Sequence, residues 1–160
     1  MKIGLGGGCH WCTEAVFAAL RGVEQVEQGY IRADAPHDNW SEAVQLHVDL
    51  AVIPLVALIE VHLRTHASTS AHKMRGKYRS AIYVENDADA ASARDILEHL
   101  AKSFEAPLVT QVLPLRSFDP SPERYRNYAQ KNAGGPFCNT YIDPKLALLR
   151  RQFAAHLHSE

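Results

Sequence analysis

Two cysteines lie close together near the N-terminus, directly after a run of glycines. Residues 5–15 read LGGGCHWCTEA, so Cys9 follows three glycines and Cys12 completes a C-x-x-C spacing. Glycines permit a tight turn from a strand into a helix. At a helix start, free backbone amides and the helix dipole stabilise a thiolate. The pattern fits a nucleophilic Cys9 and a buried structural cysteine after an ordinary turn equally well.

Cys12 is open to more than one interpretation. The C-x-x-C spacing is typical of a thioredoxin-like redox pair or of half a zinc site. The predicted helix also places Cys12 on the same face as Ala15, Val16 and Ala19, which favours a core position. Haem attachment is excluded, because the histidine lies between the two cysteines and not after them.

Glu42 is a carboxylic acid that the residue pattern places on the buried side of a strand. It begins an alternating segment, 42–50, and has the parity of Val44, Leu46 and Val48. Its carboxyl group is therefore predicted to face the apolar side of a sheet. Burial there favours the protonated form, which can donate a proton. A strand-end glutamate that turns out to solvent is the alternative.

Hydrophobic periodicity predicts the elements that hold these residues. Strands are expected at 2–5, 24–32, 42–50, 79–84 and 108–115, and helices at 9–20, 54–65, 87–104, 121–131 and from 143 onward. This order predicts an α+β fold, a two-layer sandwich in which a ferredoxin-like mixed or antiparallel sheet packs against helices. We expect one domain over 1–160, with an α/β core over 1–118 and a long C-terminal arm over 119–160.

Composition limits the class of protein. The chain has 160 residues, of which 46% are hydrophobic, and a formal net charge of -1. These values suit one compact domain and give no reason to expect nucleic acid or a membrane as a partner. No apolar run approaches the length of a membrane span, and the N-terminus does not fit a secretory signal. An odd count of three cysteines argues against a disulfide framework. We expect a cytoplasmic monomer.

Several segments, taken in order, resemble the peptide methionine sulfoxide reductases of the A type. They are GGGCHWCTEAVF (6–17), GVEQVEQGY (22–30), SEAVQLHV (41–48), GKYRSAIYVEN (76–86), ERYRNYAQKN (123–132) and PFCNTYIDPKLALLRRQF (136–153). The likeness covers nearly the whole chain in the order of the family. It is therefore more specific than the cysteine motif alone.

The resemblance implies a reaction. Cys9 would attack the sulfur of methionine S-sulfoxide, free or in proteins, and take its oxygen as a sulfenic acid while methionine leaves. Glu42 would protonate the oxygen. Cys138, which follows Gly134 and Gly135, would then form a disulfide with Cys9 that thioredoxin, or dithiothreitol, reduces. No metal or bound cofactor is implied. A tail cysteine without a role is the alternative for Cys138, and Cys12 could join as a thiol relay.

The resemblance also implies substrate contacts. Tyr78 and Tyr128 match two tyrosines that hydrogen-bond the sulfoxide oxygen, and His10 and Trp11 match two aromatic side chains that cradle the substrate methyl group. Without the family, each tyrosine would suit an ordinary half-buried position.

The chain departs from the family pattern at four places. His10 replaces a phenylalanine, and Trp40-Ser41-Glu42 replaces H-A-E. The loop after Tyr30 is short and lacks a tyrosine, and Lys73 stands near an aspartate position of the family. These departures bear on substrate affinity and identity.

Three alternative functions remain. Cys9, Cys12, His62, His66 and His72 could form a metal-binding module, although their spacing fits no standard zinc finger. A weakly active homologue could bind another sulfoxide. A general thiol–disulfide oxidoreductase could use Cys9 and Cys12, although the chain lacks a thioredoxin-like layout.

Overall fold

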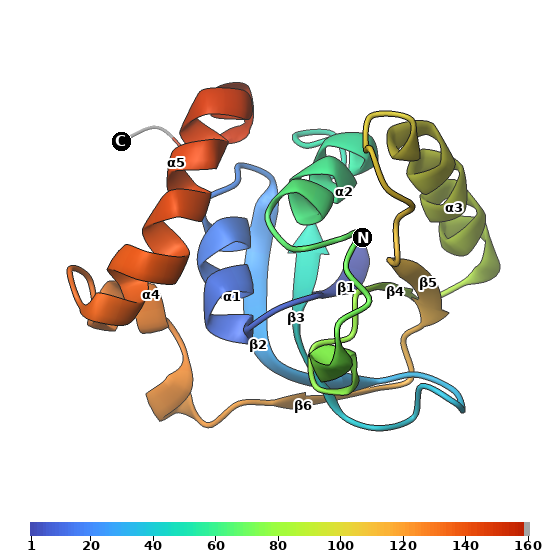
Figure 1. The fold of residues 1–160 in the computed structure, drawn as a ribbon, viewed down its shortest axis with the longest axis horizontal. Coiled ribbons are helices and arrows are strands. Elements are labelled where there is room, and N and C mark those ends of the chain that lie inside the picture. The colour runs from blue at the N-terminus through green and yellow to red at the C-terminus, as the bar shows by residue number, and fades with distance from the viewer. Residues whose placement is uncertain (159–160) are drawn as a thin grey trace.

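A six-stranded sheet forms the centre of the protein, in a computed structural model that describes residues 1–158 (Figure 1). Its strands are β1 (Lys2–Gly6), β2 (Val23–Arg32), β3 (Ser41–Val48), β4 (Ala81–Val84), β5 (Gln111–Pro114) and β6 (Ser117–Pro120). They lie in the order β5-β4-β1-β3-β2-β6. β4 and β5 run parallel, and the other neighbouring pairs are antiparallel. The predicted α+β class is confirmed.

Helices cover one face of this sheet, and the two C-terminal helices pack against the first helix (Figure 1). They are α1 (His10–Ala18), α2 (Leu55–Arg64), α3 (Asp87–Ala101), α4 (Tyr128–Lys131) and α5 (Asp143–Gln152), with short helical turns at Lys73–Gly76, Glu123–Tyr125, Cys138–Ile142 and Ala154–His156. α2 begins after Pro54, and the Asn86 side chain caps α3 by accepting from the amide of Asp89 at 2.8 Å. Within residues 1–158, no helix has the length and apolar character needed to cross a membrane.

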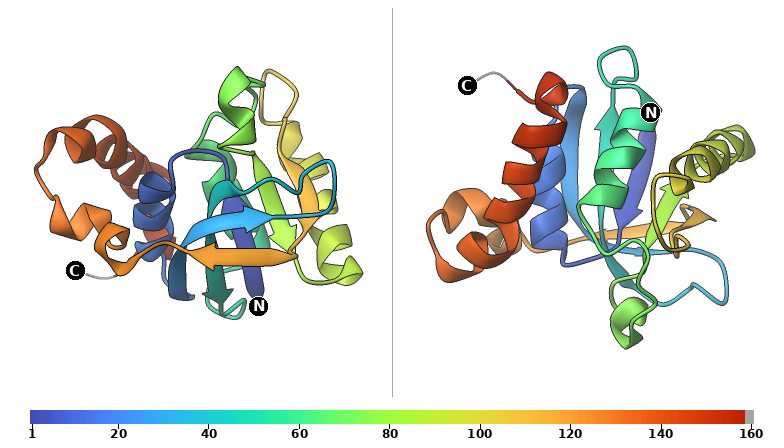
Figure 2. Two further views of the ribbon diagram at one scale, coloured as in Figure 1. Left: turned by 90° about the horizontal axis from the view of Figure 1, so that it is seen from below. Right: turned by 45° about the horizontal axis from the view of Figure 1, so that its top comes forward.

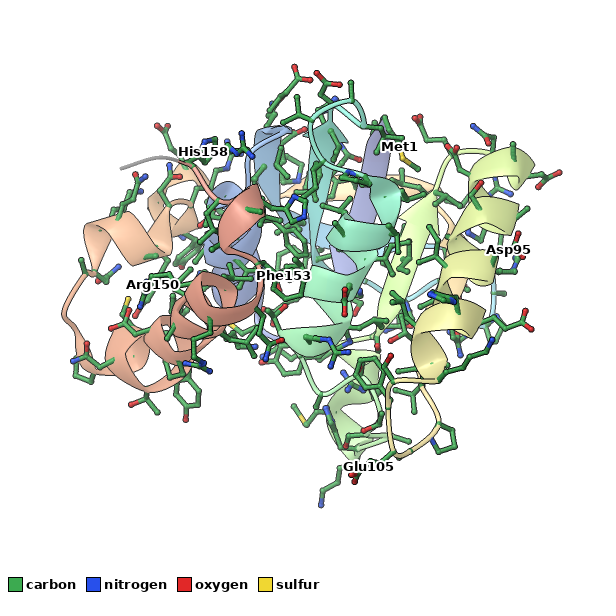
Figure 3. The ribbon with its side chains drawn as sticks, turned by 90° about the horizontal axis from the view of Figure 1, so that it is seen from above. Met1, Asp95, Glu105, Arg150, Phe153 and His158 are labelled. Atoms are coloured by element: carbon green, nitrogen blue, oxygen red, sulfur yellow. The ribbon has the colours of Figure 1, made fainter. Side chains whose placement is uncertain are left out.

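The main core lies between the sheet and these helices. Alternate residues of the central strands, such as Leu5, Leu46 and Ile82, pack there against α1, α2 and α3. The C-terminal helix joins the same core through Leu149 and Phe153. Figure 3 shows Phe153 on the inner side of this segment.

The sheet curls around a second, smaller core on its other face (Figure 2). Ile31 and Tyr83 are fully buried there, with Phe118 of β6 packed against them. The packing is close at Gly4, where a Cβ atom would lie 2.6 Å from the Ile31 side chain. A larger residue at this position would have to displace the end of the Ile31 side chain.

The expected ferredoxin-like sandwich is wrong for the fold as a whole. The four central strands follow the order β4-β1-β3-β2, but β5 and β6 extend the sheet beyond them. β6 pairs with β2 and β5 pairs with β4, so the 111–120 segment joins both edges of the curled sheet. A four-strand, two-layer arrangement cannot include this closure.

Two local predictions also differ from the structure. The short strand β6 was not predicted, because its four residues carry too little periodicity to stand out. The expected helix at 121–131 is broken into the Glu123–Tyr125 turn and α4. Asn127 adopts a left-handed backbone with φ 55°, which ends one helical turn before the next begins.

Candidate active site

Cys9 stands where the glycine turn meets α1. It occupies the N-cap position of the helix, and its carbonyl oxygen accepts hydrogen bonds from the amides of Cys12 at 3.1 Å and Thr13 at 3.2 Å. The turn is packed tightly, since a Cβ atom on Gly7 would lie 2.4 Å from the His66 ring. The predicted position of Cys9 at a strand-to-helix turn is confirmed.

The thiol groups of Cys9 and Cys12 share a hydrogen bond. The pKa of Cys9 is lowered to about 7, first by a hydrogen bond from the Cys12 thiol and also by the Trp11 backbone amide. Burial and the charge of Glu42 act in the opposite direction. The same hydrogen bond and burial raise the pKa of Cys12. Cys9 is therefore the thiolate of the pair and Cys12 the proton donor.

Glu42 faces the start of α1, as its strand parity predicted. It is 6% exposed, and its Oε1 accepts the backbone N–H of His10 at 3.2 Å. Lys77 Nζ lies 3.6 Å from its Oε2. Its carboxyl group is near enough to Cys9 for its charge to act on the thiol. A carboxyl group and a thiolate thus share one site.

His10 is held between β2 and β3 and is only 6% exposed. Its Nδ1 lies 3.0 Å from the carbonyl oxygen of Gly29, which only accepts, so Nδ1 carries the proton. Its Nε2 lies 3.4 Å from Glu42 Oε1. The Glu42 carboxyl group therefore lies next to both the backbone amide and the ring of His10.

Trp11 and Tyr128 form an aromatic wall. Their rings stack at a centroid distance of 4.1 Å and an interplanar angle of 6°. Phe137 meets both rings edge-on, at 5.4 Å from each. The backbone N–H of Tyr128 is held by Glu14 Oε1 at 3.2 Å. Sequence reasoning missed Phe137 and Glu14.

Tyr30 was also missed as a site residue. It pairs directly with Glu42 across β2 and β3, and its ring lies edge-on to His10 at 5.3 Å. Burial and the charge of Glu42 raise its pKa. The predicted Tyr78 follows Lys77 in the chain. The Lys77 Nζ atom that lies near Glu42 is also 5.1 Å from the centre of the Tyr78 ring. An antiparallel pairing of the predicted strands 24–32 and 42–50, in the register that places Tyr30 opposite Glu42, would have identified Tyr30 from the sequence.

Cys138 lies inside the protein. It is 2% exposed, in the turn Cys138–Ile142, and packs in one cluster with Cys12 and Ile142, against which Cys9 also packs. Of the two glycines before it, Gly134 adopts a positive φ of 80°. All three sulfur atoms are free thiols. The structure therefore brings the three cysteines together.

The histidines proposed for a metal site are hydrogen-bonded to protein groups. His62 Nε2 donates to the Gly6 carbonyl oxygen at 2.8 Å, and His66 Nε2 lies 2.8 Å from Ser80 Oγ. His72 is exposed in its own turn. In the part of the chain that the structure describes, no group of three or more His, Cys, Asp or Glu side chains could hold a metal ion. The metal-binding alternative is not favoured.

Comparison with known proteins gives one consistent result. The family model for peptide methionine sulfoxide reductase matches residues 1–157. The protein named peptide methionine sulfoxide reductase MsrA from Chromobacterium violaceum is 34% identical over 166 residues, covering 94% of each chain. A protein of the same name from Thermus thermophilus is 32% identical over 167 residues, covering 96% of this chain and 95% of its own.

Solved structures agree on the fold. Reduced Mxr1 from Saccharomyces cerevisiae superposes with a TM-score of 0.77 at 24% identity, over 88% of this chain and 90% of that chain. Mxr1 in complex with Trx2 gives a TM-score of 0.64 at 23% identity, over 78% and 82%. The residues matched by the family model, 1–157, include the glycine turn and Cys9. The chain therefore belongs to the peptide methionine sulfoxide reductase family.

Proposed function

We propose that this protein reduces methionine S-sulfoxide, free or within proteins, to methionine. The observation that carries the proposal is the pairing of a thiolate-forming Cys9 with the buried carboxyl group of Glu42 at the start of α1. The Cys9 thiolate attacks the sulfoxide sulfur, and Glu42 donates a proton to the oxygen. Oxygen passes to Cys9 as a sulfenic acid, and methionine is released.

The surrounding side chains bind and orient the sulfoxide. Trp11 and Tyr128 supply an apolar wall for the methyl group, with His10 closing the site beside Glu42. Tyr30 and Tyr78 flank Glu42 and its partner Lys77, where phenol groups can donate hydrogen bonds to the oxygen.

A second thiol then regenerates the enzyme. Cys138 forms a disulfide with the oxidised thiol and water leaves, and Cys12, which lies in the same cluster, is available as a relay. Thioredoxin reduces the resulting disulfide, as the relative solved with Trx2 suggests by analogy. Because thiols and a carboxyl group supply this chemistry, no bound cofactor or metal enters the proposal.

We also propose that residues 1–160 act as one domain and as a cytoplasmic monomer. The packing of Leu149 and Phe153 in the main core supports the first point, since the C-terminal arm completes that core. Three free cysteines suit a reducing compartment.

The test is turnover on the two epimers of methionine sulfoxide, measured by NADPH oxidation coupled through thioredoxin reductase and thioredoxin. We expect turnover of the S epimer only, none with Cys9→Ser, and one methionine per chain with Cys138→Ser. A folded protein that reduces neither epimer would refute the proposal.

A further inference from the structure

We propose that Lys145 is a positioning residue for the regeneration step. Its partly buried ammonium group holds Cys12 as the thiolate that attacks the Cys9 sulfenic acid, and Cys138 then attacks Cys12, which releases Cys9 and leaves a Cys12–Cys138 disulfide. The first step of this inference rests on the proposed function, because Cys9 must first be oxidised.

Lys145 reaches the thiols from the first turn of α5. A small cavity between α1, α2 and α5 is lined by Cys12, His62, His66 and Lys145. Lys145 Nζ donates to the carbonyl oxygen of Thr65 at the end of α2. The ammonium group and the Cys12 thiol therefore share one enclosed space.

No carboxylate neutralises this ammonium group. None of the ion pairs formed by residues 1–158 includes Lys145. The two histidines on the cavity are held neutral, since burial lowers the pKa of His62 to about 4 and that of His66 well below its usual value. The groups that can offer a negative charge to Lys145 are thus Cys12 and Cys9, whose charges act on it.

The order of events follows from the thiol pair. In the reduced protein, Cys12 keeps its proton mainly because it donates a hydrogen bond to Cys9, and burial adds to this effect. Conversion of Cys9 to a sulfenic acid removes the thiolate that accepts this bond. Burial still raises the pKa of Cys12 at that stage, and the charge of Lys145 acts against burial. Cys12 becomes nucleophilic only after Cys9 has been oxidised.

The steps balance without a further reagent. The Cys12 thiolate attacks Cys9 Sγ, a disulfide bond forms, the S–O bond breaks, and hydroxide leaves as water after taking one proton from solvent. The Cys138 thiolate then attacks Cys12 Sγ, which releases the Cys9 thiolate and leaves a Cys12–Cys138 disulfide. The Cys9 and Cys138 thiols both raise the pKa of Cys12. For Cys9, the thiol that acts on its pKa is Cys12. Thioredoxin supplies the two electrons that complete the cycle.

The test isolates the first disulfide in a Cys138→Ser background. Lys145→Met and Lys145→Gln remove the charge, Lys145→Arg keeps it, and Lys102→Met changes an exposed lysine at the C-terminal end of α3. Each reduced protein receives one equivalent of methionine S-sulfoxide or, in a second arm, of hydrogen peroxide. Mass spectrometry follows the Cys9–Cys12 disulfide, dimedone traps the sulfenic acid, and circular dichroism confirms folding.

We expect the neutral variants to form the Cys9–Cys12 disulfide about tenfold more slowly, because a shift of one pKa unit changes the thiolate fraction about tenfold. The pH profile of the rate should move to higher pH, more sulfenic acid should be trapped, and Lys145→Arg should restore the rate. A purely structural lysine would not move the pH profile. Lys102→Met should behave as its parent.

Two results would overturn the inference. One is an unchanged rate and pH profile in both neutral variants, and the other is formation of a Cys9–Cys138 disulfide before any Cys9–Cys12 disulfide in the full chain. A different failure is also distinguishable. If sulfoxide yields no methionine but peroxide still reveals the Lys145 dependence, the proposed function fails and this inference stands.

Discussion

Cys9 and Cys12 together hold one proton at the start of α1, and this sharing selects the thiol that reacts first. The hydrogen bond from Cys12 is the largest cause of the lowered Cys9 pKa, ahead of the backbone amides. Helix-start position alone, which the sequence pattern indicated, is therefore only part of the activation. Cys12 contributes to the chemistry even before any disulfide forms.

Replacing Cys12 should consequently change the pH dependence of Cys9. The thiolate is the reactive form, so the rate of Cys9 alkylation rises with pH and is half-maximal at about 7, the pKa of Cys9. In Cys12→Ala the hydrogen bond is lost, and we expect the midpoint to move up toward the ordinary thiol value of about 8.5. Iodoacetamide alkylation across a pH range of about 5 to 10, in a Cys138→Ser background, measures this shift. Cys12→Ser keeps a donor and should shift less, and an unmoved midpoint in Cys12→Ala would contradict the assignment.

Glu42→Gln tests the acid. Glutamine keeps an oxygen that can accept the hydrogen bond from the His10 backbone amide, but its amide group cannot act as an acid. We expect the rate of the first methionine released to fall about 100-fold, the usual scale of general acid catalysis. Rapid-quench measurement of that methionine gives the rate. Glu24→Gln, an exposed change on β2, is the matched control. Equal rates in Glu42→Gln and wild type would exclude Glu42 as the proton donor.

At the scale of elements, α1 and α4 build the aromatic wall, which we propose binds the substrate, from residues that lie far apart in sequence. The Trp11–Tyr128 stack joins the two helices, and the bond from the Tyr128 amide to Glu14 fixes α4 onto α1. The face of the Tyr128 ring is occupied by Trp11. We therefore expect the ring of Tyr128, more than its hydroxyl group, to account for its contribution to substrate binding.

Tyr128→Ala and Tyr128→Phe separate these roles. We expect Tyr128→Ala to raise KM about fivefold, since an aromatic pair contributes about 1 kcal/mol beyond its buried area. Tyr128→Phe keeps the ring and should leave KM nearly unchanged. Steady-state kinetics on the S epimer measures both. A large fall in kcat for Tyr128→Phe would instead assign the hydroxyl group to the reacting oxygen.

At the scale of the whole molecule, the packing that positions the thiols also buries histidines in their neutral form. His62 lies in the core beneath the glycine turn, and burial lowers its pKa from 6.5 to about 4. His66 is shifted in the same direction. Between about pH 6.5 and pH 4, His62 is protonated in the unfolded chain but neutral in the folded protein. The free energy of unfolding therefore falls as the pH decreases from about 6.5 to about 4.

His62 alone should account for about 3 kcal/mol of this loss, at about 1.36 kcal/mol per pKa unit. Urea unfolding at pH values of about 7, 5.5 and 4 measures the slope, and His62→Gln should remove roughly that part of it. His99→Gln, an exposed change on α3, should leave the slope as in wild type. An unchanged slope in His62→Gln would show that another group governs acid stability.

Local patterns predicted the features that depend on residues a few positions apart. The glycine run before Cys9 indicated its turn, and alternation in 42–50 indicated the face that Glu42 occupies. The long α3 followed from its spacing of apolar residues and its acidic first turn. Short or interrupted elements such as β6 and α4 escaped prediction, since a few residues carry little periodicity.

The sequence by itself determined the α+β class, the thiol at a helix start and the inward-facing acid, because each is encoded by neighbours along the chain. Only the tertiary structure decided that Tyr30 lies opposite Glu42, that His10 is held by Gly29, and that Lys145 shares a cavity with the distant Cys12. These contacts depend on strand register and on how helices dock. Local periodicity does not determine strand register or helix docking, because both depend on how distant segments fit together when the core forms.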